Sequence, residues 1–96
     1  MWFVCIRRNP ANRERRVAQL TSHFDWIRAQ HDTGRIVASG PTTDRVHGIY
    51  ILNANSLEEA RATVETDPGV AAGDCTYELF AWDVRQLFGL GEFHPA

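Results

Sequence analysis

The sequence predicts an α+β domain with the element order β-α-β-β-α-β, the ferredoxin-like arrangement. Three observations predict it: four short runs rich in β-branched and aromatic residues, two longer segments with apolar residues every three or four positions, and turn-forming residues between them. Right-handed crossovers then place both helices on one face of a four-stranded antiparallel sheet.

The first strand is expected over residues 2–7, where apolar side chains occupy both faces. Asn9 is expected to cap the first helix, with Pro10 as its first residue and its end near Asp32. Gly34 supplies the stop. The helix is expected to lie on the sheet through a stripe at helical spacing: Val17, Leu20, Phe24, Ile27 and His31.

The second and third strands are expected over residues 35–40 and 48–53. The turn-forming run "GPTTDRVHG" separates them, so the two strands should form a hairpin. The fourth strand is expected over residues 75–83, again apolar on both faces.

The second helix begins with a capping box, in which Ser56 is the N-cap and Glu59 follows three residues later. Its buried face is marked by Leu57, Ala60 and Val64. The helix is expected to end at Asp67, because a residue before proline is pushed out of the α region. An acid there faces the negative end of the helix dipole, which is locally unfavourable and raises the question of its purpose.

Composition limits the function classes. The 96 residues suit a single domain, residues 1–96, with an apolar tail from about residue 86. The net charge is −2 and no basic face is concentrated, so nucleic acid is not an expected partner. All ten basic residues are arginine, which excludes a lysine Schiff base. No run is long enough for a membrane span or a signal peptide, so a cytoplasmic location is expected.

Neither a metal nor a cofactor is expected. The histidines show no ligand spacing, and there is no glycine-rich phosphate loop. Cys5 and Cys75 lie in apolar runs and are expected to be reduced core residues, although spacing alone does not decide whether they pair.

The sheet face opposite the helices is expected to be apolar, since the first and fourth strands are apolar on that side too. A monomer rarely exposes a large apolar patch. We therefore expect two sheets to pack face to face in a homodimer, with a higher oligomer left open. The apolar tail is expected to reach toward the partner or to cap a cavity between sheet and helices.

His23 is the first candidate catalytic residue. It lies about 80° from the centre of the apolar stripe, on the shoulder of the first helix and near Trp26. Asp67 shares the sheet-facing side of the second helix. A carboxylate within about 3 Å of the ring would fix its tautomer and make it a better base. The alternatives are a boundary histidine without function and an Asp-Pro-Gly turn in which Asp67 binds the amides that follow.

Ser39, Gly40 and Pro41, at the end of the second strand, are candidate substrate-binding residues together with Trp26. A hydroxyl and a nearby N–H can hold a substrate oxygen, and glycine allows close approach. A simple turn is the alternative.

The stretches "SHFDWIRAQHDTGRIVASGPT", "SLEEARATVETDPGVAAG" and "YELFAWDV" are, in this order and spacing, similar to the YCII-related family. The resemblance covers roughly residues 2–88. It implies a dimeric α+β barrel of ferredoxin-like protomers and a pocket where His23 and Asp67 act as an acid/base pair, with Ser39 and Gly40 nearby. The short loop "PTTDRVHG" and the apolar end "LFGLGEFHPA" depart from commoner members, so the substrate does not transfer.

The expected function is that of a small cofactor-free enzyme acting on a cyclic oxygenated small molecule, as an isomerase, lyase or dehalogenase. His23 would move the proton and Asp67 would orient it. Two other functions stay open: a non-catalytic ligand-binding or regulatory dimeric barrel, and a cofactor-free monooxygenase.

Overall fold

The computed structural model describes residues 1–87 and the backbone of residues 91–92. Along the chain its elements are β1 (Trp2–Arg8), α1 (Arg13–Asp32), β2 (Ile36–Pro41), β3 (His47–Asn53), α2 (Leu57–Val64), α3 (Pro68–Ala71), β4 (Thr76–Trp82), β5 (Gln86–Leu87) and β6 (Gly91–Glu92).

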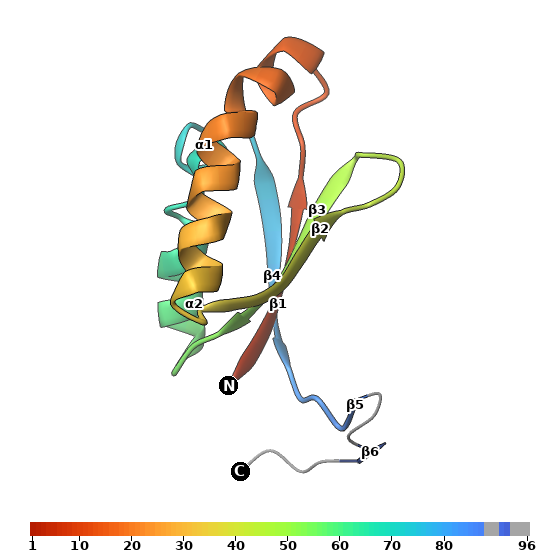
Figure 1. Cartoon of the computed structure of the whole chain (residues 1–96), viewed down its shortest axis with the longest axis vertical. Helices are drawn as coiled ribbons and strands as arrows, with labels where there is room; N and C mark the ends of the chain where they lie inside the picture. The colour runs from red at the N-terminus through yellow and green to blue at the C-terminus, as the bar shows by residue number, and fades with distance from the viewer. Residues whose placement is uncertain (88–90, 93–96) are drawn as a thin grey trace.

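The main sheet has the strand order β2-β3-β1-β4, and every neighbouring pair is antiparallel. The helices lie on one face of it (Figure 1). The expected β2–β3 hairpin is present, with Ser39 opposite Tyr50. The ferredoxin-like prediction is therefore confirmed.

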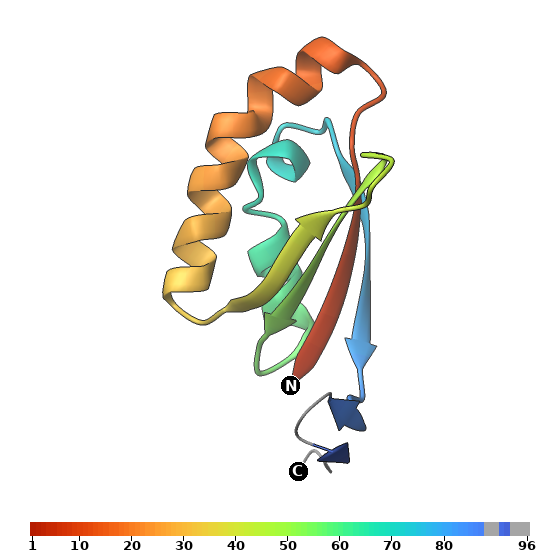
Figure 2. The same cartoon turned by 45° about the vertical axis from the view of Figure 1, so that its right-hand side comes forward.

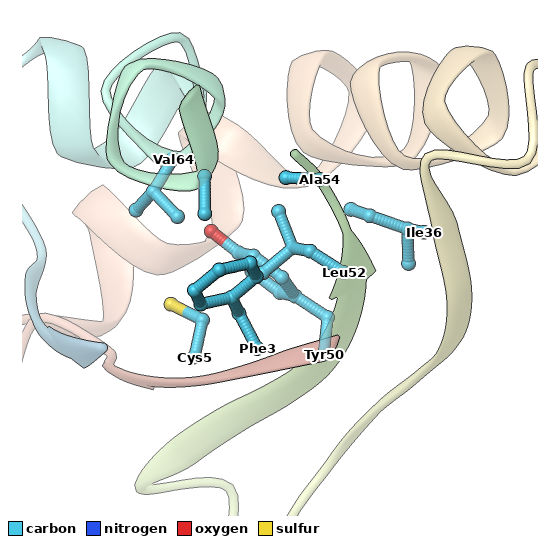
Figure 3. Close-up of a cluster of buried hydrophobic side chains, with 8 residues drawn as sticks. Phe3, Cys5, Ile36, Tyr50, Leu52, Ala54 and Val64 are labelled. Atoms are coloured by element: carbon cyan, nitrogen blue, oxygen red, sulfur yellow. The ribbon is translucent and has the colours of Figure 1, made fainter. Parts of the chain in front are cut away.

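The hydrophobic core lies between the sheet and α2 (Figure 3). Phe3 and Cys5 of β1 and Tyr50 and Leu52 of β3 point into it from the sheet. The core is completed by Ile36 of β2, by Ala54 after β3, and by Ala60 and Val64 of α2. Cys5 and Cys75 are both buried and unpaired with each other, as expected of reduced core cysteines. Burial raises the pKa of the Cys5 thiol to about 11, which suits a structural rather than a reactive role.

The predicted start of the first helix is wrong. Asn12 caps α1, accepting from the Arg15 N–H at 3.2 Å. Asn9 instead stays bound to the β2–β3 hairpin: its N–H donates to the Val46 carbonyl at 2.9 Å and its side chain donates to the Arg45 carbonyl at 2.8 Å. Pro10 consequently lies outside the helix.

The predicted end of the second helix is also wrong. Ser56 caps α2 as expected, accepting from the Glu59 N–H, but the helix ends at Val64. Asp67 is the N-cap of the following short helix, α3, with Pro68 at its first position. Asp67 thus lies at the favourable, positive end of a helix, and the expected dipole penalty does not exist.

Three residues of the predicted α1 stripe do not pack into the core, whereas Ile27 does pack against it. Val17, Leu20 and Phe24 are 56%, 46% and 57% exposed, and no residue of α1 is fully buried. These side chains line a cavity between α1 and the sheet. The pattern that predicted a core contact therefore marks a cavity wall.

The sheet face without helices carries partly exposed apolar side chains. Ile49, Phe80 and Trp82 are each 39–47% exposed, and Val4 lies between Ile51 and Phe80 in register. No element of the described chain covers this face (Figure 2).

The described part of the tail, β5 and β6, lies beyond the end of the sheet opposite the start of α1 (Figures 1 and 2). This part of the tail therefore does not cap the cavity between α1 and the sheet. The remaining tail, residues 88–90 and 93–96, lies outside the described residues. Among the described helices none is long and apolar enough to cross a bilayer.

Candidate active site

A cavity of about 580 Å³ lies between α1 and the β2–β3 side of the sheet. Its helix wall carries apolar side chains, polar ones and His23, while its sheet wall carries Ser39, Gly40, Pro41 and Tyr50. Four of the residues singled out from the sequence are thus brought to one cavity.

Asp67 lies directly behind His23 and is completely buried. Its Oδ1 accepts from the Gly69 N–H at 3.1 Å and lies 3.5 Å from His23 Nδ1. Its Oδ2 accepts from the Tyr50 hydroxyl at 3.2 Å and lies 2.9 Å from Arg7 Nε. One carboxylate therefore joins β1, β3, α1 and α3.

The state of this carboxylate follows from its neighbours. Burial by itself raises the pKa of Asp67, but the adjacent His23, the Arg7 guanidinium and the Gly69 amide outweigh burial and hold the pKa below its usual range. Burial and the nearby acidic groups raise the pKa of Tyr50, so its hydroxyl stays protonated and can donate. Asp67 is therefore an ionised acceptor at neutral pH.

His23 approaches Asp67 without completing a hydrogen bond. Its side chain is 20% exposed, and the buried Nδ1 has no hydrogen-bond partner, the 3.5 Å to Oδ1 being too long for a full bond. Such contacts are often long in unliganded sites and tighten when substrate binds. The ring is also stacked on Trp26, with centroids 6.2 Å apart.

Arg7 Nε likewise has no aligned hydrogen bond although it lies within ion-pair distance of Oδ2. Arg7 is buried, and its Nη1 donates to the Asn9 side chain at 3.1 Å. Removing its carboxylate partner would leave a buried charge uncompensated, which typically costs about 3–5 kcal/mol.

Trp26 and Ser39 have contacts that the sequence did not suggest. Trp26 does not line the cavity: its indole N–H donates to the Thr66 hydroxyl at 2.9 Å, next to Asp67, and its ring meets Tyr50 edge-on. Trp26 thus contacts His23 and Tyr50 and does not face the cavity. Ser39 does line the cavity, and its hydroxyl lies 2.8 Å from His31 Nε2.

Arg7 and Tyr50 were not singled out from the sequence. The signal for Arg7 was available, because strand alternation puts it on the same buried face as Phe3 and Cys5, where a charge needs a partner. Tyr50 gave no comparable signal, since a tyrosine in a strand is ordinary.

A metal centre receives no support from residues 1–87. No group of three His, Cys, Asp or Glu side chains gathers in a way that could hold an ion there.

The fold is ferredoxin-like, and the histidine that lines its cavity lies beside a buried carboxylate. The family model of the YCII-related domain matches residues 1–83, and the chain belongs to this family. The uncharacterized protein YjpA of Bacillus subtilis (strain 168) is 28% identical over 67 residues, which are 70% of this chain and 79% of YjpA.

The solved structures include a similar fold, that of 5-chloro-2-hydroxyhydroquinone dehydrochlorinase (TftG) from Burkholderia phenoliruptrix AC1100, in complex with 2,5-dihydroxybenzoquinone. The TM-score is 0.73 at 22% identity, covering 85% of this chain and 93% of TftG. At this identity the likeness establishes the fold alone.

Gly69 gives a direct test of how tightly the cluster is packed. A methyl group there would overlap Arg7 Nη2 and would lie 2.6 Å from Gln19 Oε1 and 2.7 Å from Cys75 Sγ. Gly69→Ala should therefore lower the free energy of unfolding by about 1–3 kcal/mol, measured by urea denaturation. Gly48→Ala is the control, because its methyl meets nothing within 4 Å. Equal stability of the two variants would contradict this packing.

Proposed function

We propose that the protein is a cofactor-free acid/base enzyme acting on a cyclic, oxygen-bearing small molecule. The observation that carries the proposal is the His23–Asp67 approach beside the cavity: a buried carboxylate 3.5 Å from a histidine Nδ1, with the same histidine lining a hollow of about 580 Å³. Proton transfer by a positioned histidine needs these parts and no others.

The roles follow from the geometry. Because Nδ1 faces Asp67, Nε2 is the ring nitrogen left to exchange a proton with the substrate. Asp67 holds the tautomer and stabilises the imidazolium that forms. Arg7 and Tyr50 keep the carboxylate in place from its other side. Ser39, with Gly40 and Pro41, orients a substrate oxygen across the cavity.

The neighbouring structure supports this substrate class. TftG is described as a dehydrochlorinase of a chlorinated hydroxyhydroquinone, and its complex contains a dihydroxybenzoquinone. A single six-membered ring fits the cavity volume, which lies within the range of small-molecule sites. In elimination of HCl a base takes a proton from the substrate while the C–Cl bond breaks and chloride leaves with its electron pair. In isomerisation the proton is returned at another atom. Both reactions need a positioned acid/base and no further redox partner.

His23→Ala should lower kcat at least about 100-fold on any ring compound that the wild type converts, because the general acid/base is lost. The measurement is a steady-state assay of a panel of ring compounds that begins with 5-chloro-2-hydroxyhydroquinone. Turnover of this first compound is measured as released chloride. His47→Gln, outside the cavity, is the control and should keep wild-type rates. Full activity of His23→Ala would end the proposal, and ligand binding without turnover by the wild type would indicate a binding module.

We also propose that two copies pack through the uncovered sheet face. Its apolar side chains on β1, β3 and β4 are partly exposed in one chain, and burying them is worth about 25 cal/mol per Å².

The wild type should have twice the chain mass in light scattering at micromolar concentration, and Phe80→Glu should shift it to a monomer. Leu57→Glu is the control, since Leu57 is similarly exposed, at 42%, but lies on α2. A monomeric wild type, or dimers that persist in Phe80→Glu, would exclude this interface.

A further inference from the structure

The lining of the cavity is strongly basic. Four arginines belong to it: Arg7, Arg13, Arg16 and Arg45. Among the described residues no Asp or Glu lines the cavity. The charge of Arg7 is matched by Asp67. Within the part of the chain that the structure describes, Arg13, Arg16 and Arg45 have no carboxylate at ion-pair distance.

Two of these arginines lie at the start of a helix, where a positive charge is unfavourable. Arg13 and Arg16 are in the first turns of α1, where the helix dipole is positive and basic side chains are repelled. Their neighbour Arg15 is compensated by Asp74 at 2.8 Å. The Arg16 guanidinium is held by the Pro10 and Ala11 carbonyls, which fix its position without neutralising its charge.

The third arginine is held in an unfavourable backbone conformation. Arg45 has φ of 66°, and within the described chain it is the one residue other than glycine with a positive φ. The Asn9 side chain donates to the Arg45 carbonyl at 2.8 Å and also accepts from Arg7. Asn9 therefore links the β2–β3 hairpin, which carries Arg45, to Arg7 of β1, the ion-pair partner of Asp67.

Another part of the cavity lining is apolar. Val17, Leu20 and Phe24 form an apolar wall, and His23 lies on the same helix face between Leu20 and Phe24 in the chain. A ligand complementary to both parts of the lining has an apolar ring and a negatively charged group at one end. Arginine forks match a carboxylate with two parallel hydrogen bonds.

We infer that the substrate is a ring compound bearing a carboxylate, with the carboxylate bound by Arg13, Arg16 and Arg45 and the ring placed against the apolar wall beside His23. This inference rests on the proposed function for the reacting end of the molecule, but it concerns recognition alone.

The test compares two ligands that share the same ring and differ at one group, which is charged in the first and is a neutral methyl ester in the second. Calorimetric titration with 2,5-dihydroxybenzoate and its methyl ester should show the carboxylate binding about ten-fold more tightly or better at low salt. Raising NaCl from about 20 to about 300 mM should reduce this preference, because partly exposed charges are screened. Equal affinity for the two ligands, or no binding of the carboxylate at millimolar concentration, would overturn the inference.

Variants then assign the preference to the three arginines. The triple variant Arg13→Gln, Arg16→Gln, Arg45→Gly should bind both ligands equally, and the glycine also relieves the strained φ. Arg28→Gln, on the same helix but outside the cavity, should keep the full preference. A preference that survives in the triple variant would contradict the assignment.

The two proposals can fail separately. His23→Ala keeps all three arginines and should keep the charge preference. Turnover that survives in His23→Ala, with the preference intact, would remove the catalytic proposal alone. Turnover that depends on His23 in a wild type with no charge preference would remove this inference alone.

Discussion

The buried carboxylate of Asp67 is the constraint on which the arrangement of the site depends. An ionised group with no solvent contact must be compensated by protein groups, and here each compensating group comes from a different element: Arg7 from β1, Tyr50 from β3, His23 from α1 and Gly69 from α3. Two of these groups, Arg7 Nε and His23 Nδ1, are left without completed hydrogen bonds. Under the proposed function, the contact between Asp67 and His23 would shorten when a positive charge forms on the ring.

The same residue serves two purposes that looked like alternatives in the sequence. As an N-cap, Asp67 accepts from the Gly69 amide and starts α3, which is the turn-forming interpretation of Asp-Pro-Gly. As a partner of His23, it uses the same oxygen from another direction. The cap positions the carboxylate with backbone geometry, so its direction toward α1 does not depend on side-chain rotamers alone. Glycine at position 69 is required for both, because Arg7 occupies the space of a methyl group.

The sequence was sufficient for the β-α-β-β-α-β order of the main elements and for the hairpin, because periodicity is a local property. The approach of Asp67 to His23 was expected from a place on the second helix and from the family resemblance, but Asp67 lies beyond α2 and reaches His23 as the N-cap of α3. The sequence was not sufficient for helix ends: Asn9 has good capping chemistry, but hydrogen bonds to Val46 and Arg45 keep it in the strand connection. The apolar stripe of α1 was ambiguous for a different reason, since a cavity wall and a core contact need the same residues. The Arg7–Asp67 pair spans 60 positions and becomes apparent only when β1 and α3 are brought together.

If Asp67 orients His23, the neutral ring carries its proton on Nδ1 and leaves Nε2 to the cavity. Nitrogen-15 NMR of histidine-labelled protein between about pH 6 and 8 measures this tautomer directly. The Nδ1–H form is expected for neutral His23 in the wild type, and a mixture of tautomers is expected in Asp67→Asn. A neutral His23 with its proton on Nε2, unchanged by the substitution, would show that the carboxylate does not orient the ring.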